Sequence, residues 1–304
     1  MSQGRSLELF FINGNPDGML TAEVFNWTGH VLVAPRVQIK DALARREARH
    51  TGVYVLLGDQ GGNTLAYVGE GEDVAARIRD HDARKDWWSK AIIITSAADS
   101  LHKAHAKYLE SRLVEMARVV ASVPLENGAT PTRSSLSEAA QANMEEFLET
   151  LGMVLPALGI TMFQSKRRPA QMHPSTLEGH VEIVFELKTP KHQIEARAEL
   201  RGGEFVVLSG SFVRKIWAGK GEHDFGYQNL HKSLVASGVI DVSATPATFT
   251  ENYAFNSPSA AAAVVNGRPA NGRTEWKLAG DGRTLKQWEQ DELSTASSEE
   301  TSDG

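Results

Sequence analysis

Arg77 and His81 stand four residues apart in a stretch that the sequence predicts to be helical, so their side chains share one face. A guanidinium meets two phosphate oxygens at once and keeps its charge, whereas an imidazole can hydrogen-bond a phosphate or relay a proton. Glu110 lies near the apolar stripe of a later helix, where a carboxylate costs free energy unless a cation or a donor meets it. These residue types suit a site that binds an anion and a cation. The alternatives are salt bridges for Arg77 and Glu110, and packing for His81.

The preceding segments must position these side chains. Segments 52–58 and 64–69 are rich in Val, Tyr and Leu without a helical period, which favours mostly buried strands. Gly61 and Gly62 between them tolerate positive φ, as a hairpin turn requires. Asp73 stands where an N-cap belongs, so we expect a helix to start immediately after it.

Two triplets in these strands, Gly52-Val53-Tyr54 and Tyr67-Val68-Gly69, resemble the two half-motifs of the GIY-YIG nuclease superfamily. The order and spacing extend the resemblance: Arg77 lies on the next helix, His81 stands where the family has Tyr or His, and Glu110 lies inside a later helix. That superfamily includes excision-repair endonuclease subunits, homing endonucleases and some restriction enzymes. The resemblance implies a compact sheet flanked by helices and hydrolysis of phosphodiester bonds.

The resemblance also implies a role for each residue. Tyr67 is the general base toward the attacking water and Tyr54 orients the water or the phosphate, although either tyrosine alone is also typical of strand packing. Arg77 clamps the phosphate, His81 relays the proton or hydrogen-bonds the phosphate, and Glu110 binds Mg²⁺ or Mn²⁺. The reference pKa of tyrosine is about 10, so proton removal needs the metal or another cation to lower it. Which tyrosine is the base stays open at this point.

The sequence departs from the family pattern at two places. Some members carry Lys directly after the second half-motif, whereas this chain has Glu70, which changes the charge next to Tyr67. Members also tend to have an Asn beyond the catalytic Glu, and Asn127 is the candidate nearby.

The composition is that of a chain with ordinary globular cores, with 304 residues and 41% hydrophobic content. There are no cysteines, which excludes disulfides, Cys-ligated zinc and thiol nucleophiles. The N-terminus lacks a basic region followed by a long apolar run, and no segment has the apolar length to span a bilayer. We therefore expect a cytoplasmic protein without membrane contact.

The net charge of -6 argues mildly against a surface coated with nucleic acid. Residues 289–304 hold six acidic and no basic side chains, so the rest of the chain is net neutral, and we expect this tail to be disordered. Basic clusters at 45–49 and 166–168 can meet phosphate, with solvated helix faces or a linker as the alternative.

The pattern of strands, helices and Pro- or Gly-rich stretches predicts an α/β (α+β) fold, with a small GIY-YIG-type sheet flanked by helices and then a second small α/β domain. We expect an N-terminal hairpin and helix extension (1–50), a nuclease-like domain with a C-terminal helix (51–160), a linker (161–178), an accessory domain (179–286) and a disordered acidic tail (287–304). In the first half we expect strands at 7–14, 22–27 and 90–95, and helices at 36–48, 100–120 and 137–156. Trp87 and Trp88 favour core packing over base stacking.

The second domain begins with alternating strands joined by short turns, which predicts an antiparallel sheet. Ser257-Pro258 is a good helix start and Gly267 a good stop. Residues 181–286 resemble a domain of unknown function that often follows GIY-YIG modules, a resemblance that implies no established activity.

The leading hypothesis is a metal-dependent endonuclease that hydrolyses phosphodiester bonds in DNA, in repair, restriction or defence, and whose C-terminal domain selects substrate or a protein partner. The first alternative is a nucleic-acid-binding module that has lost catalysis. The second is a partner-binding scaffold with the same fold. The substrate form, the oligomeric state and the pathway stay open.

Overall fold

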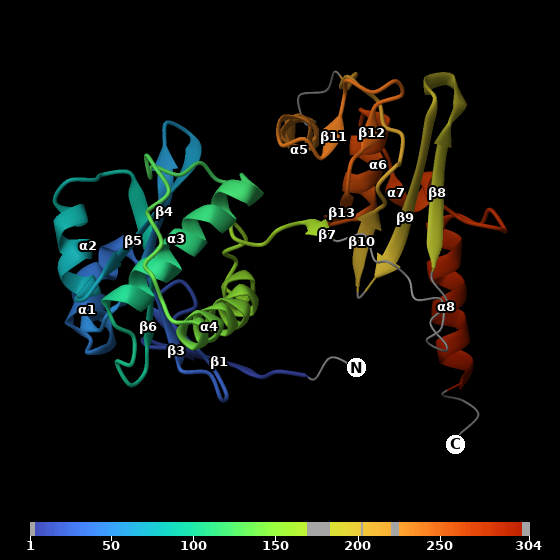
Figure 1. Cartoon of the computed structure of the whole chain (residues 1–304). Coiled ribbons are helices and arrows are strands. Elements are labelled where there is room, and N and C mark those ends of the chain that lie inside the picture. The colour runs from blue at the N-terminus through green and yellow to red at the C-terminus, as the bar shows by residue number, and fades with distance from the viewer. Residues whose placement is uncertain (1–3, 169–182, 202, 220–224, 300–304) are drawn as a thin grey trace. The chain divides into compact units, whose positions relative to one another are not determined.

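The structure is a computed structural model that describes residues 4–168, 183–201, 203–219 and 225–299 (Figure 1). The fold is mixed α/β, as predicted, and the described residues form two antiparallel six-stranded sheets and eight α-helices. The chain divides into two compact units, residues 1–165 and 166–304. Within the described ranges, none of the helices combines the length and the apolar character that a bilayer crossing needs.

The sheet of the first unit has the strand order β1-β2-β3-β6-β4-β5. Its strands are β1 (Leu7–Phe11), β2 (Leu20–Val24), β3 (Gly29–Pro35), β4 (Gly52–Gln60), β5 (Asn63–Gly71) and β6 (Trp88–Ser96). The predicted N-terminal hairpin is part of this same sheet, because β3 pairs with both β2 and β6. No element was predicted at the position of β3, an apolar run that lies almost wholly inside the core.

Helices cover both faces of this sheet, with α3 and α4 on one side and α1 and α2 on the other (Figure 1). They are α1 (Ile39–Ala44), α2 (Val74–Asp82), α3 (Lys103–Val120) and α4 (Glu138–Ala157), with short 3₁₀ turns η1 (Arg36–Gln38) and η2 (Glu47–Arg49). The stretch 36–48, predicted as one helix, is thus three short pieces, because the backbone is extended at Arg45 and ends α1 there.

The alternation of side chains along β4 explains why two cores form. Val53 and Val55 belong to the core under α3 and α4, whereas Tyr54 and Leu56 belong to the core under α2. All four are fully buried. Residues 53–57 of this strand, covered on both faces, therefore form a continuous apolar run in which the tyrosine is the one polar side chain.

The second unit has the sheet order β14-β8-β9-β10-β13-β7 and a separate two-stranded ribbon, β11-β12. Its strands are β7 (Arg167–Arg168), β8 (Val184–Thr189), β9 (Ile194–Arg201), β10 (Glu204–Val207), β11 (Ile240–Asp241), β12 (Thr248–Phe249), β13 (Asn252–Phe255) and β14 (Lys277–Leu278). Its helices are η3 (Pro190–His192), α5 (Phe225–Ala236), α6 (Pro258–Asn266), α7 (Gly272–Glu275) and α8 (Leu285–Glu299). The side chain of Ser257 caps α6, and Gly267 ends it at a φ of 60°, so the predicted start and stop of this helix are both confirmed.

Two predicted segments differ from the structure. In the predicted linker, Arg167 and Arg168 form β7, which pairs with β13; the rest of that linker from residue 169 lies outside the described residues. The predicted disordered tail is wrong for residues 287–299, which are helical in α8. The reason is packing, because Leu285 is buried and the ring of Trp288 lies 5.6 Å from that of Phe185. Residues 300–304 lie outside the described part.

Candidate functional site

The antiparallel register of β4 and β5 brings the two tyrosines together. Tyr54 pairs with Gly69 and Leu56 pairs with Tyr67, so Tyr54 and Tyr67 are diagonal neighbours. Side chains alternate along a strand, so both rings lie on the face that α2 covers. Their ring centroids are 6.2 Å apart.

Gly69 is required by this arrangement. A Cβ at residue 69 would lie 2.4 Å from the Tyr54 hydroxyl oxygen and 2.9 Å from Cε1 of Tyr67. The ring of Tyr54 therefore crosses the backbone of β5 at a point where only glycine leaves room. The glycine of the second triplet has a steric reason in this chain that is independent of any family pattern.

Helix α2 presents Arg77 and His81 to the same region. Asp73 caps the helix, accepting a hydrogen bond of 2.9 Å from the backbone nitrogen of Ala76. A Cβ at Gly71 would lie 2.7 Å from Cγ of Arg77, so the side chain of Arg77 crosses the end of β5. Nε2 of His81 lies 2.8 Å from the Tyr54 hydroxyl.

The imidazole of His81 is neutral at pH 7. Burial, and then the positive charges of Lys85 and Arg77, lower the pKa of His81 to about 4. A neutral imidazole has one acceptor nitrogen, so it can accept a hydrogen bond from the Tyr54 hydroxyl. The His81 ring centroid also lies 4.8 Å from that of Tyr67. His81 thus contacts both tyrosines.

Glu110 reaches this region from the opposite face of the sheet, because α3 packs against β5 at the sheet edge. Burial, and next the negative charge of Glu70, raise the pKa of Glu110 to about 7, while the charges of Arg77 and Lys103 oppose the rise. Lys103 pairs with Glu70 at 2.9 Å. The site therefore straddles the edge strand β5, with Tyr67 on one face and Glu70 on the other.

Both tyrosines are protonated at neutral pH. Burial raises the pKa of Tyr54 far above its usual value, Tyr67 adds to the rise and the charge of Arg77 opposes it. The pKa of Tyr67 is also raised, first by burial and then by the charge of Glu110, and Arg77 again opposes. Tyr54 is fully buried whereas Tyr67 is half-buried, so Tyr67 is the tyrosine that a water molecule can approach.

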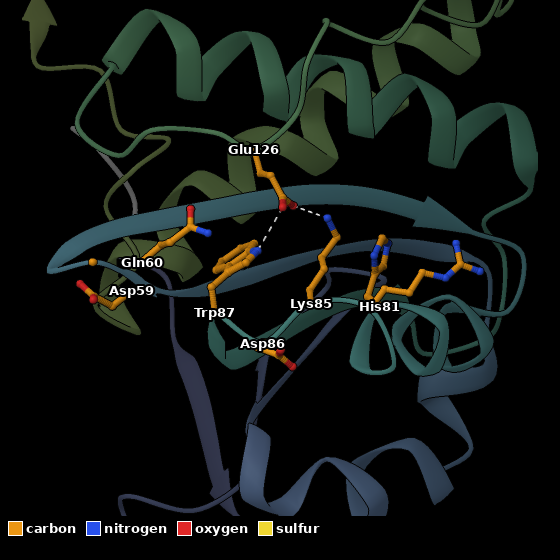
Figure 2. Close-up of a pocket in the computed structure, with 9 residues that line it drawn as sticks. Asp59, Gln60, His81, Lys85, Asp86, Trp87 and Glu126 are labelled. Carbon is orange, nitrogen blue, oxygen red and sulfur yellow. Dashed lines mark hydrogen bonds and ion pairs between the residues drawn. The ribbon is translucent and has the colours of Figure 1, made fainter.

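An open hollow of about 670 Å³ adjoins His81 (Figure 2). Lys85 and Trp87 both point to Glu126 there, Lys85 through an ion pair and Trp87 through a hydrogen bond of 3.1 Å from Nε1. Nζ of Lys85 also lies 4.9 Å from the ring centroid of Tyr67. The Lys85–Glu126 pair thus borders the hollow beside the Tyr67 ring.

The loop after α3 covers part of the exposed edge of β5. The backbone of Ala66 bonds to Pro124 and Glu126 at 3.0 and 2.8 Å. The side-chain amide of Asn127 bonds to both backbone groups of Val68, at 2.9 and 2.8 Å. Asn127 thus holds the strand next to Tyr67 and acts on the site by fixing the backbone.

The residues present fit a divalent cation. In the described part of the chain no group of three or more His, Cys, Asp or Glu side chains could hold a metal ion. Mg²⁺ does not need such a group, since it binds proteins through one or two carboxylates and keeps water and substrate oxygens. A half-buried carboxylate whose pKa is raised to about 7, next to a second carboxylate, is a group that a cation stabilises.

Sequence reasoning missed two neighbours of the site. Lys103 lies seven residues before Glu110 on α3, which puts both on one face of the helix, so the spacing could have revealed it. Lys85 carries no such indication, because it follows the end of α2 and meets Tyr67 only through the tertiary fold.

Comparison with known proteins identifies part of the second unit. Residues 185–289 match DUF4357, a domain of unknown function. This match overlaps most of residues 181–286, the region that resembles a domain of unknown function. No curated protein and no solved structure matches the chain significantly.

Proposed function

We propose that the first unit is a metal-dependent endonuclease of the GIY-YIG type that hydrolyses phosphodiester bonds in DNA. The observation that supports this best is the convergence of the five side chains at the edge of β5. Tyr54, Tyr67 and His81 contact one another, and the charges of Arg77 and Glu110 both act on the two tyrosines. A scaffold or a simple binding module has no need of a half-buried carboxylate next to Glu70.

In this proposal Arg77 binds the scissile phosphate. Arg77 is an exposed residue, and its guanidinium stays charged and can donate to two phosphoryl oxygens, so it offsets the negative charge that grows in the transition state. Glu110, with Glu70 beside it, would hold Mg²⁺ or Mn²⁺. When bound, such an ion supplies positive charge for the phosphoryl oxygens and lowers the pKa of water.

Tyr67 is the better placed of the two tyrosines to receive the proton of the attacking water, because Tyr54 is fully buried. The negative charge of Glu110 helps to keep the pKa of Tyr67 high. A cation that neutralises this carboxylate would therefore lower the pKa of Tyr67. Arg77 already favours the phenolate. Tyr54, held by neutral His81, maintains the packing over Gly69 and orients the hydroxyl of Tyr67.

The test is cleavage of labelled duplex, branched and single-stranded DNA, and of RNA, with Mg²⁺, with Mn²⁺ and with EDTA. We expect cleavage of at least one DNA form that requires the metal and disappears in Glu110→Gln, while DNA binding persists. Glu146→Gln, on the exposed side of α4, is the matched control and should cleave as wild type does.

Two outcomes would refute the proposal. Wild-type cleavage by Glu110→Gln would remove this residue from the reaction. Absence of cleavage on every substrate, together with DNA binding that ignores divalent ions, would favour the binding module instead.

A further inference from the structure

Three segments of the second unit meet at one place: residues 189–192, residues 214–218 and the C-terminal end of α6 with the residues that follow it, 266–268. Thr189, directly before η3, donates a hydrogen bond of 2.9 Å from Oγ1 to Oδ1 of Asn266, the last residue of α6. The segment 214–218 runs past the same end. The backbone nitrogen of Arg214 bonds to the carbonyl of Val265 at 2.9 Å, and that of Ala218 bonds to Gly267 at 2.7 Å.

Each segment brings cations to this place, which we call the basic patch and define as Lys191, Arg214, Lys215 and Arg268. A Cβ at Gly267 would lie 3.0 Å from Cβ and Cδ of Arg214, so the Arg214 side chain lies on the residue that precedes Arg268. Lys191 and Lys215 are exposed. Three of the four cations act on one neighbour together: desolvation, and then the charges of Arg214, Lys191 and Arg268, lower the pKa of His192.

Compensation of this charge within the described chain is incomplete. Arg268 pairs with Glu275 at 3.0 Å, and Lys215 lies close enough to Asp241 to lower its pKa, after the hydrogen bonds from Ser243. Lys191 and Arg214 form no ion pair with any carboxylate that the structure describes. The C-terminal end of α6 supplies a partial negative charge of only about half a unit. Two cations of the patch therefore remain for an outside anion.

An apolar side chain lies beside these cations. Ile216 is 73% exposed and directly follows Lys215. The ring of the half-buried Trp217 lies 6.1 Å from that of His231, whose Nε2 is 3.0 Å from the carbonyl oxygen of Arg214. This contact fixes the segment that carries Arg214 and Ile216, so the cations and the apolar side chain have a defined arrangement.

We propose that the basic patch binds single-stranded nucleic acid, with Lys191 and Arg214 on backbone phosphates and Ile216 against the face of an unpaired base. Single strands are bound by cations that follow the backbone and by side chains, mostly aromatic, that pack on exposed bases; an exposed aliphatic side chain offers the same apolar contact without ring stacking. Paired bases would not offer that face. A lipid surface fits less well, because it needs several apolar side chains to insert and the patch exposes one. This inference concerns the second unit and does not depend on nuclease activity.

The experiment uses the full chain in EDTA and a fluorescently labelled 20-nucleotide single strand, followed by anisotropy over a range of salt concentrations. The double variant Lys191→Ala/Arg214→Ala should bind about 10- to 30-fold more weakly at 0.1 M salt and reduce the slope of log K against log salt by about 1.4, or about 0.7 for each lost phosphate contact. The single variant Lys191→Ala, at an exposed position, should show about half of this slope change, whether or not Arg214 matters for folding.

The matched control is Lys188→Ala/Arg273→Ala. It removes the same charge from the same unit, but Lys188 pairs with Glu186 and Glu195, and Arg273 with Glu289. We expect this control to bind as wild type does. Equal losses in both double variants would indicate a general charge effect and refute the patch.

Hydrogen exchange locates the contact independently. The oligonucleotide should protect amides in segments 189–192, 214–218 and 266–268. Protection confined to the first unit would refute the proposal. Binding to vesicles of phosphatidylserine and phosphatidylcholine, without protection of these segments by the oligonucleotide, would refute it in favour of a membrane contact.

Discussion

Polar and charged side chains lie in different environments in the sheets of the two units. In the first unit helices bury both faces, so β4 carries a continuous apolar run and its polar side chains are costly. In the second unit β8 and β9 turn residues such as Phe185 and Ala196 to the core, while Glu195 and Arg197 lie exposed on the other face. Lys188 there pairs with Glu186 on its own strand and with Glu195 on the neighbouring strand.

This difference explains how easily a site can be recognised in each unit. A polar residue within a doubly covered sheet, or on a helix face turned toward it, needs a specific partner. Tyr54 on β4 and Glu110 on α3 therefore stand out by their burial and by their raised pKa values. A charge on an exposed sheet face is solvated and paired at little cost, so it carries no such information. In the described part of the second unit, the proposed site is indicated by the arrangement of Lys191 and Arg214, which pair with no described carboxylate.

The largest effect should come from Arg77→Lys. Lysine keeps the charge but loses the two-oxygen contact, so we expect cleavage to fall by about 10²- to 10³-fold with little change in melting temperature, because Arg77 is exposed. Single-turnover cleavage measures this. Arg197→Lys, an exposed arginine of the second sheet, is the control and should change nothing. Wild-type cleavage rates in Arg77→Lys would mean that the two arginines do not differ and that Arg77 has no specific role in cleavage.

The two units can next be compared by adding one methyl group to each. In Gly69→Ala the new Cβ meets the Tyr54 hydroxyl, and in Gly272→Ala it meets the backbone of Pro258 at 2.1 Å. Both should lose about 1–3 kcal/mol or more of stability in chemical denaturation. Cleavage per folded molecule should fall only for Gly69→Ala. Equal loss of cleavage in both would mean that the site depends on general stability.

The pH dependence of stability should have opposite signs in the two units. The pKa of Glu110 is raised from 4.5 to about 7, so in metal-free protein its ionisation lowers stability as pH rises through this window. Glu110→Gln should therefore raise the melting temperature in EDTA at pH 8 and leave it unchanged near pH 4.

Glu204 is the counterpart in the second unit. The hydrogen bond from Arg168 lowers the pKa of Glu204 below 4.5, so this carboxylate stabilises the fold above that value and the contribution is lost as pH falls through the lowered pKa. Glu204→Gln should lower the melting temperature at pH 8, and the effect should fade in acid. If the melting temperatures of Glu110→Gln and Glu204→Gln shifted in the same direction at pH 8, the predicted difference between the two units would be wrong.

The smallest effect should come from removing one lysine in each unit. Lys103→Met leaves Glu70 unpaired beside Glu110, so the pKa of Glu110 should rise further and the acid limb of the cleavage profile should move up by about one pH unit or less. Lys188→Met should leave both the profile and the melting temperature unchanged. If the pH profile of cleavage did not change in Lys103→Met, the Glu70–Lys103 pair would not contribute to the site.

The sequence alone determined the local features of this protein. The glycines at 61 and 62, the cap at Asp73 and the start and stop of α6 follow from residue types within a few positions of each other. The shared face of Arg77 and His81 follows from helical spacing. The strands next to the turn were predictable for the same reason, because β-branched and aromatic content without a helical period and turn chemistry are both local.

Only the tertiary structure decided which distant residues meet. The place of β3 between β2 and β6, the packing of Trp288, and the approach of Lys85 to Tyr67 depend on strand order and on which face each helix covers. Glu110 reaches Glu70 because α3 packs at the edge of β5, and its raised pKa follows from that burial. Such contacts join residues far apart in the chain, and local periodicity carries no information about them.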